Sequence, residues 1–235
     1  MEAIILAGGF GTRLHSLVAD VPKAMAPING RPFLEFLLDI LVRNNFTKVI
    51  LSVHYKSDVI IKYFANKYKS LEIEYANENF PLGTGGAIKN SLRLVSENYA
   101  FVFNGDTFLN FDIFAINEMW QIYKLPIIVL KKHTDASRYN SVSINENYIT
   151  ALSKPIQSNG KFLINTGCYV LPKNCFDGFD YGKSFSFEID YLNEAVQKLN
   201  FKYFIEDTFF IDIGTPGDYL HACKILNGSF VNDNQ

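Results

Sequence analysis

Glycine and cationic residues are concentrated just after a short apolar run at the start of the chain. The run continues into Ala7-Gly8-Gly9-Phe10-Gly11-Thr12-Arg13-Leu14, and Lys23 follows within the pair Pro22-Lys23. Glycines let backbone N–H groups face an anion that side chains would otherwise obstruct. Arg13 and Lys23 add fixed positive charge at the same place. The pattern predicts a phosphate-binding loop rather than an ordinary surface turn.

Two common phosphate-binding loops do not fit this segment. The Walker string G-x-x-x-x-G-K-[ST] does not occur in the sequence. The dinucleotide fingerprint G-x-G-x-x-G would need a third glycine, and Leu14 stands at that position. The loop therefore belongs to another class of phosphate site.

Two aspartates stand where ligands of a divalent cation are expected. Asp106 follows an apolar run over 101–104, at the carboxyl end of a predicted strand, where open α/β sheets bind ligands. Asp212 lies among apolar residues, and a carboxylate there is costly unless it is paired or bound to a cation. Each could instead form a turn or a helix cap. Together with the loop they favour Mg²⁺, which commonly takes only one or two protein carboxylates beside phosphate oxygens.

A sheet is needed to bring these residues together, and the first half of the chain predicts one. Apolar strand patterns alternate with helical patterns; we expect strands at 4–7, 48–53, 71–76, 99–104 and 127–131. The expected helices cover 33–42, a segment that Ser57 would cap, 86–95 and 111–123. This βαβα succession predicts an α/β fold with three αβα layers: a Rossmann-like, mixed but mainly parallel sheet.

The second half is expected to contribute short strands and two helices. Strands are predicted at 139–144, 148–152, 162–171 and 201–204, and an apolar run over 209–213 leads into the last helix. Ser186 would cap a helix over 187–199, and Thr215-Pro216 would begin the last helix.

Composition sets limits on partners and location. Hydrophobic residues make up 48% of the chain, charged residues 20%, and the net charge is −2. This balance gives no electrostatic basis for binding nucleic acid or an anionic membrane. The first apolar run is too short for a signal peptide or a membrane span. The three cysteines form no C-x-x-C pair, so reduced thiols and a cytoplasmic location are expected.

The loop with Pro22-Lys23, Gly105-Asp106 and the late string Asp212-Ile213-Gly214-Thr215-Pro216 resembles the signature of the sugar-1-phosphate nucleotidylyltransferases. The resemblance implies the nucleotide-diphospho-sugar transferase type of fold. It also implies the reaction, in which a sugar-1-phosphate oxygen attacks the α-phosphorus of a nucleoside triphosphate and pyrophosphate leaves. Arg13 and Lys23 would be catalytic, and Asp106 and Asp212 would hold Mg²⁺.

The family resemblance also implies a set of nucleotide-binding residues. Its segment Pro81-Leu82-Gly83-Thr84-Gly85-Gly86-Ala87 lies against the nucleobase, and this version favours guanine, although the glycines alone would also suit a structural helix start. We expect the following residues to bind the nucleotide: Leu6, Ala7, Gly8, Gly9, Gly11, Thr12, Pro81, Gly83, Thr84, Gly85 and Asn104.

On the sugar side the match is less complete. Lys154 corresponds to the lysine that holds the sugar phosphate, and Asn165, Gly167 and Glu188 correspond to sugar-binding positions. Glu188 also suits the first turn of a helix, where the helix dipole favours an acid. Ser153 replaces the usual glutamate, and Asn140 replaces a common glycine. The sugar therefore stays open on this evidence.

Within the family, the chain most resembles the D-glycero-D-manno-heptose 1-phosphate guanylyltransferases. The resemblance implies GTP and heptose 1-phosphate as substrates, GDP-heptose as product, and a role in capsule or lipopolysaccharide biosynthesis. We expect one domain over 1–227, with a nucleotide half (1–110), a sugar half (111–227) and a loose tail at 228–235, as a monomer or homodimer.

Four alternatives follow from the same residues. Two are nucleotidylyltransferases for mannose 1-phosphate and for N-acetylmuramate 1-phosphate. A glycosyltransferase that consumes nucleotide sugars would carry a D-x-D string, but Phe108 occupies the second acidic position. A non-catalytic regulatory relative would be expected to lose Arg13, Lys23 or one of the two aspartates. This chain keeps all four of these charged residues.

Overall fold

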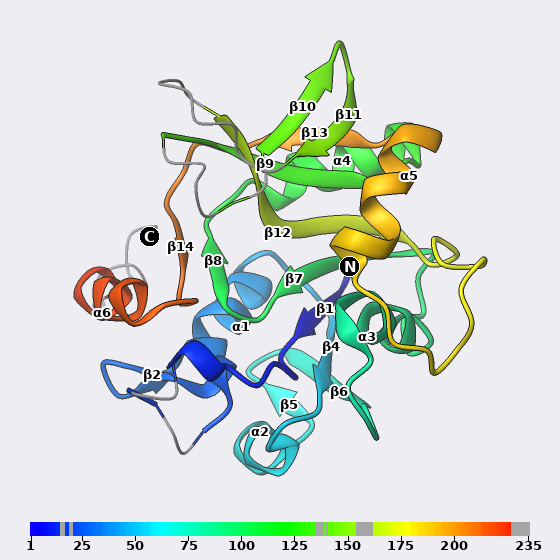
Figure 1. Ribbon diagram of the computed structural model, residues 1–235. Helices are drawn as coiled ribbons and strands as arrows, with labels where there is room; N and C mark the ends of the chain where they lie inside the picture. Colours follow the sequence, from blue (N-terminus) through cyan, green and yellow to red (C-terminus); the bar gives the residue numbers. More distant parts are fainter. Residues whose placement is uncertain (15–16, 19–20, 135–138, 140, 154–161, 227–235) are drawn as a thin grey trace.

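A ten-stranded mixed sheet forms the centre of the molecule (Figure 1). The computed structural model describes residues 1–14, 17–18, 21–134, 139, 141–153 and 162–226. The strands of this sheet are β1 (Glu2–Leu6), β4 (Lys48–Val53), β5 (Lys67–Tyr68), β6 (Leu71–Asn77), β7 (Tyr99–Asn104), β9 (Ile127–His133), β10 (Ser141–Asn145), β11 (Tyr148–Ser153), β12 (Phe162–Pro172) and β13 (Lys202–Ile205).

The sheet is parallel at its centre and mixed toward one side. Its order is β11-β10-β12-β7-β1-β4-β6-β5, and β9 joins β12 to β13. Strands β7, β1, β4 and β6 are parallel neighbours, whereas β12 is antiparallel to β7 and β9. The predicted three-layer α/β fold is confirmed. The carboxyl ends of β7, β1, β4 and β6 consequently meet at one edge, where such sheets bind ligands.

Alternate residues of each strand supply the two apolar layers on either face. In β1, Ala3 and Ile5 belong to the layer formed with α1 (Phe33–Arg43), α2 (Ser57–Phe64) and α4 (Ile113–Tyr123). Ile4 belongs to the opposite layer, formed with α3 (Gly83–Leu92), the π-helical turn η3 (Phe187–Leu192) and α5 (Asn193–Lys198).

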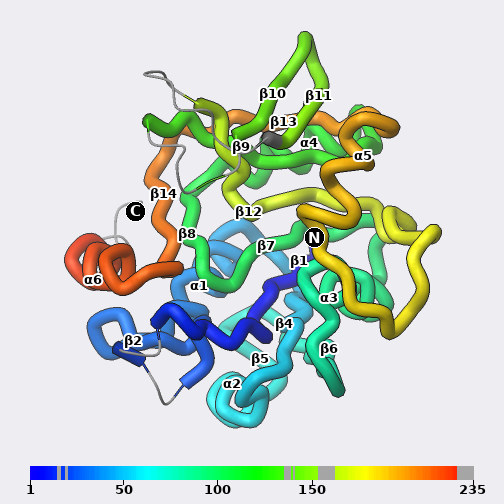
Figure 2. The backbone as a smooth tube through the Cα atoms, in the orientation of Figure 1, coloured from blue at the N-terminus to red at the C-terminus, as the bar shows by residue number. Residues whose placement is uncertain are grey.

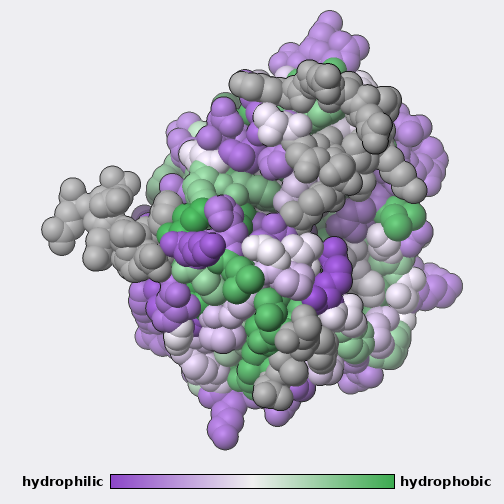
Figure 3. Space-filling view, turned by 60° about the vertical axis from the view of Figure 1, so that its left-hand side comes forward, coloured by the Kyte–Doolittle hydropathy of each residue, from purple (hydrophilic) through white to green (hydrophobic). Residues whose placement is uncertain are grey.

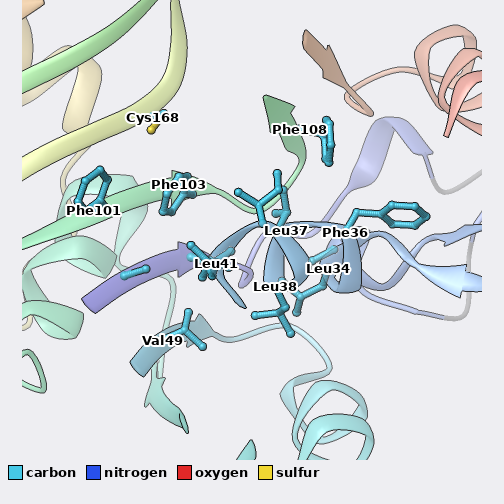
Figure 4. Packing of buried hydrophobic residues seen from close by; sticks show 14 of the residues in the cluster. Leu34, Phe36, Leu37, Leu38, Leu41, Val49, Phe101, Phe103, Phe108 and Cys168 are labelled. Atoms are coloured by element: carbon cyan, nitrogen blue, oxygen red, sulfur yellow. The ribbon is translucent and has the colours of Figure 1, made fainter. Parts of the chain in front are cut away.

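Helix α1 shows how tightly the first layer is packed. Leu34, Leu37, Leu38 and Leu41 are all buried, and Figure 4 shows them along the helix facing the strands that carry Phe103 and Val49. The helix begins directly after Pro32, which precedes it as N-cap residue. These leucines belong to the same buried cluster as Phe103 and Val49, so α1 packs against the central strands.

Three predicted helix starts were wrong, whereas several strands differ from their predicted ranges by one or two residues. Ser57 does not cap α2 but is its first helical residue; Lys56 occupies the N-cap position in the left-handed conformation, with φ of 50° and no side-chain capping hydrogen bond. Helix α3 covers Gly83–Leu92 rather than 86–95, because the carbonyl of Phe185 accepts hydrogen bonds from the N–H groups of Gly85 and Gly86. The first turn of a helix has N–H groups without partners inside the helix, and here a carbonyl from a distant segment accepts two of them. Helix α4 begins at Ile113 rather than 111, because the Asp112 side chain caps it.

The Ser186 and Thr215 caps were predicted correctly. The Ser186 side chain accepts a hydrogen bond from the Ile189 N–H at 3.1 Å. The Thr215 side chain accepts one from the Asp218 N–H at 3.3 Å at the start of α6 (Pro216–Ile225). Within the part of the chain that the structure describes, no helix is long and apolar enough to cross a membrane.

A buried carboxylate on α1 makes stability depend on pH. Asp39 accepts hydrogen bonds from Lys69 Nζ at 2.6 Å, Arg31 Nη2 at 2.9 Å and the Tyr68 hydroxyl at 2.9 Å. Burial raises the pKa of Asp39, but these hydrogen bonds outweigh it, so that the pKa lies below its usual value. The unfolded chain therefore binds the proton more readily than the folded chain, and acid favours unfolding.

We expect Asp39→Asn to lower the free energy of unfolding by at least about 2 kcal/mol at pH 7. This deficit should shrink as the pH falls below about 4, because the carboxylate of the unfolded chain takes up its proton there and that of the folded chain only at lower pH. Urea denaturation of both proteins between pH 7 and pH 3 measures the difference. A deficit that stays constant over this range would show that Asp39 does not cause the acid sensitivity.

Candidate active site

The glycine loop leaves the end of β1 and turns back over the edge of the sheet. A Cβ at Gly8 would lie 3.1 Å from the backbone nitrogen of His54, so the loop passes close to the end of β4. Gly11 has a φ of 63°, and a Cβ there would lie 2.9 Å from the Cβ of Lys23. Glycine at position 11 thus permits both the backbone conformation and the approach of Lys23. The loop then ends in the 3-10 turn η1 (Thr12–Leu14), which carries Arg13.

A small second sheet brings the two aspartates together. Strand β14 (Phe210–Asp212) pairs antiparallel with β8 (Thr107–Leu109), so that Asp212 lies opposite Thr107. The Ile213 N–H also donates a hydrogen bond to the Asp106 carbonyl oxygen at 2.9 Å. Figure 2 shows β8 and β14 side by side although their colours mark distant parts of the chain. Neither of these two strands was predicted from the sequence.

Lys23 and Asp106 form an ion pair at this edge of the sheet. The side chain of Lys23 is 12% exposed and that of Asp106 is 35% exposed, so the pair opens toward the solvent. Asp212 is fixed separately: it accepts hydrogen bonds from the Gly214 N–H at 2.5 Å and from the Tyr139 hydroxyl at 3.0 Å. One aspartate is therefore paired with a cation, and the other is held by hydrogen bonds on the neighbouring strand.

The first of two neighbouring cavities lies over the carboxyl ends of the parallel strands. Its volume is about 310 Å³. Eight of the expected nucleotide-binding residues line it, namely Leu6, Ala7, Gly8, Gly9, Pro81, Gly83, Thr84 and Asn104, together with Lys23 and Asp106. Gly11, Thr12 and Gly85 are outside this lining. The position of a Cβ at Gly85 is filled by the ring of Phe185, at 2.2 Å, so this glycine accommodates packing.

Several residues of the first cavity were missed by the sequence analysis. Ser52, His54 and Glu78 line it and come from the ends of β4 and β6. The rule that pointed to Asp106, that ligands bind at the carboxyl ends of strands, would have pointed to these residues as well. Phe10 also lines the cavity, is 47% exposed, and contacts the rings of His54 and Tyr55.

The second cavity, of about 280 Å³, adjoins the first because Asn104 and Asp106 line both. Arg13, Asp212, Asn165 and Gly167 line it, as does Tyr139. Gly167 has a φ of 76°, and a Cβ there would lie 2.3 Å from the Asn104 amide nitrogen. The absence of a side chain at 167 therefore lets Asn104 reach across from β7 to β12.

Two residues expected on the sugar side, Lys154 and Glu188, are not among the described residues that line the second cavity. Lys154 lies outside the described residues. Glu188 is absent from the described lining of the second cavity; its carboxylate accepts hydrogen bonds from the hydroxyls of Thr84 at 2.8 Å and Ser186 at 3.2 Å. It thus connects η3 to the start of α3 on the nucleotide side.

The carboxylates present suit the expected Mg²⁺. Asp106 and Asp212 provide oxygen ligands from adjoining backbone segments that line one cavity. Among the residues that the structure describes, no group of three or more His, Cys, Asp and Glu side chains comes together as a metal site. Two carboxylates are nevertheless sufficient for an ion that also binds phosphate oxygens.

Close backbone approach next to Asp106 gives a testable consequence for stability. A Cβ at Gly105 would lie 2.4 Å from the Leu6 carbonyl oxygen, which belongs to the central strand β1. Because the Leu6 carbonyl is backbone and cannot turn aside as a flexible side chain can, Gly105→Ala should lower the free energy of unfolding by at least about 2 kcal/mol. Gly178→Ala, at a position with no atom within 4 Å, is the control and should be nearly neutral. Equal stability of the two variants in urea denaturation would contradict this account.

The fold and the two adjoining cavities define a class of protein: an α/β transferase that binds a nucleotide beside a second phosphorylated substrate. The comparison with known families agrees. The chain belongs to the nucleotidyl transferase family, whose model matches residues 2–228.

Three relatives match over nearly their full length. A D-glycero-alpha-D-manno-heptose 1-phosphate guanylyltransferase of Campylobacter jejuni is 44% identical, covering 94% of this chain and 98% of that protein. The enzyme of that name from Aneurinibacillus thermoaerophilus is 40% identical, covering 96% and 98%. The crystal structure of HddC from Yersinia pseudotuberculosis has a TM-score of 0.85 at 36% identity, covering 96% and 99%, and HddC has also been crystallised with GMP-PN.

Proposed function

We propose that this chain transfers a guanylyl group from GTP to D-glycero-α-D-manno-heptose 1-phosphate, giving GDP-heptose and pyrophosphate. The observation that carries the proposal is the position of Asp106, which lines both cavities and contacts Lys23. A site where two phosphate compounds meet needs its charged residues at this junction. The names of the relatives support guanine and heptose as the base and the sugar.

The reaction requires orientation and charge stabilisation more than proton transfer. An oxygen of the sugar phosphate forms a bond to the α-phosphorus while the bond from that phosphorus to the bridging oxygen breaks. Pyrophosphate leaves with the electron pair. The attacking oxygen is already ionised at neutral pH, so no general base is needed. Lys23, which lines the first cavity, and Arg13, which lines the second, would stabilise the charge on the triphosphate as pyrophosphate departs.

The remaining residues are assigned roles according to the cavity that they line or adjoin. Residues of the glycine loop and of the α3 start would hold the nucleotide, and Asn165, Gly167 and Lys154 would hold the sugar phosphate. Asp106 and Asp212 would hold Mg²⁺, which neutralises phosphate charge when bound. Glu188 would act indirectly, by fixing the hydroxyl of Thr84 at the wall of the first cavity.

The proposal includes a cellular setting. We infer a cytoplasmic enzyme with one domain over 1–227 that supplies a nucleotide sugar for surface polysaccharide, as a monomer or homodimer. On the face shown in Figure 3, hydrophobic residues form separate patches between hydrophilic ones. The tail at 228–235 lies outside the described residues.

Pyrophosphate release from a substrate panel tests the proposal. GTP, ATP, CTP and UTP are each combined with the 1-phosphates of heptose, mannose and N-acetylmuramate. We expect the highest kcat/KM for GTP with heptose 1-phosphate. A preference for mannose 1-phosphate or for UTP with N-acetylmuramate 1-phosphate would replace the proposed substrates. No pyrophosphate from any pair would remove the proposed reaction.

A further inference from the structure

The segment that precedes η3 runs beside α3 (Figure 1), and both line a further cavity of about 150 Å³, which we call the α3 cavity. Lys89, Asn90 and Arg93 line it from α3 and the C-terminal end of that helix. Residues 180–183 line it from the segment before η3. Its described lining contains none of the residues that line the second cavity. The α3 cavity is therefore separate from the place where the two substrates would meet.

Two cations in the α3 cavity have no carboxylate partner. Lys89 is only 7% exposed; its ammonium donates a hydrogen bond to the Phe176 carbonyl oxygen at 2.7 Å and lies 4.2 Å from the centre of the Tyr181 ring. The Arg93 guanidinium lies 5.7 Å from the centre of the same ring. Among the residues that the structure describes, neither cation forms an ion pair. A buried charge without an opposite charge is costly, so an anion bound here would be stabilised.

The two acids that line the α3 cavity have other partners. Asp180 forms an ion pair with Lys183 at 2.5 Å. The Glu78 carboxylate accepts hydrogen bonds from the Ser52 hydroxyl at 2.9 Å and from the Leu82 N–H at 3.0 Å, and Ser52 belongs to the lining of the first cavity. Three cations and two acids leave a net positive charge, which suits a phosphate group, because phosphate oxygens accept hydrogen bonds from both ammonium and guanidinium groups.

Two exposed aromatic side chains line the same cavity. Phe80 is 50% exposed and Tyr181 is 67% exposed. Flat rings such as nucleobases stack on aromatic side chains, and this stacking depends little on the identity of the ring. Asn79 and Asn90 add amide groups that can both donate and accept hydrogen bonds. This lining fits a compound that carries a ring and a phosphate group, the class to which mononucleotides belong.

The turn at the start of α3 connects the α3 cavity with the first cavity. Leu82 and Gly86 line the α3 cavity, whereas Gly83 lines the first. A Cβ at Gly86 would lie 2.9 Å from the Lys183 carbonyl oxygen, so the segment 180–183 packs directly on this turn. A ligand that bridges α3 and this segment would restrict the glycine-rich turn. A nucleotide that then binds in the first cavity would lose less conformational entropy.

We propose that the α3 cavity is an effector site for a small phosphorylated ring compound. Lys89 and Arg93 bind its phosphate group, and its binding raises the affinity of the first cavity for GTP. The inference rests on the proposed function for the identity of this nucleotide. Coupling between two binding sites is reciprocal, so GTP raises the affinity for the effector by the same factor.

Phenyl phosphate is the probe, because it joins one ring to one phosphate group. In titration calorimetry, wild-type enzyme should bind it at least about tenfold more tightly than inorganic phosphate, which has no ring. Arg93→Gln, at an exposed position, should weaken the binding of phenyl phosphate at least about tenfold. At saturating heptose 1-phosphate, phenyl phosphate should lower the KM for GTP about fivefold in the wild type and leave it unchanged in Arg93→Gln.

Arg43→Gln is the matched control, since Arg43 is an exposed arginine in the last turn of α1, in the layer on the opposite face of the sheet. This variant should respond to phenyl phosphate as the wild type does. Equal binding by the wild type and Arg93→Gln would overturn the inference. A rise in the KM for GTP would also overturn it, because it would place the probe at the active site as a competitor. A wild-type enzyme that binds phenyl phosphate through Arg93 but releases no pyrophosphate from GTP would contradict the proposed function alone.

Discussion

Asp106→Asn is expected to lower kcat/KM for pyrophosphate release by at least about 1000-fold. Asp106 lines both cavities and is ion-paired with Lys23, so one substitution removes a carboxylate from the point where both substrates meet. The amide has nearly the same shape but no charge to hold a cation. Steady-state kinetics at saturating Mg²⁺ with GTP and heptose 1-phosphate measure the loss.

Asp112→Asn is the matched control for this prediction. Asp112 caps α4 away from both cavities, and asparagine caps helices about as well as aspartate. This variant should retain wild-type kinetics and stability. Both proteins should show similar urea midpoints, because the Asp106 side chain is 35% exposed. A folded Asp106→Asn enzyme with more than about a tenth of wild-type kcat/KM would remove this aspartate from the proposed metal site.

Lys23→Gln is expected to lower kcat about 100-fold to 1000-fold, with little change in the unfolding midpoint. The ammonium group of Lys23 is the only lysine charge among the described lining residues of the first cavity. Stability should change little because its partner Asp106 still reaches solvent. Rapid-quench measurement of the chemical step separates this loss from slower binding.

Lys23→Arg should not restore activity, although it restores the charge. The Lys23 stem lies against Gly11, so there is little space around this side chain. The larger, planar guanidinium of arginine does not replace the compact ammonium of lysine in such a space. Lys67→Gln, an exposed change on β5, serves as control and should leave kcat unaltered. Wild-type rates in Lys23→Gln would assign the cationic role to other residues.

The sequence was sufficient to predict those parts of the molecule that depend on local pattern. Strands β4 and β7 have the predicted bounds, because continuous apolar runs bounded by polar residues are typical of buried strands. The Thr215 cap followed from the preference of threonine before a first-turn proline. The glycine loop could be recognised from the types and spacing of its residues alone.

Features that arise from distant contacts could not be predicted in this way. Strands β8 and β14 have three residues each, too few for a periodic signal, and their pairing joins segments about a hundred residues apart. The start of α3 depends on the Phe185 carbonyl. The hydrogen bonds that fix Glu78 likewise come from the neighbouring strand β4 and from Leu82. None of these partners is specified by the residues beside them in the sequence.

The pairing of β14 with β8 also has a consequence for biosynthesis. A ribosome can complete the glycine loop, the parallel strands and Asp106 while Asp212 is still untranslated, since that residue arrives with β14 late in the chain. A fragment that ends before this strand would contain every described lining residue of the first cavity but not Asp212. Under the proposed function, a chain terminated or cleaved at this point would therefore lack the second metal ligand and would not complete the transfer.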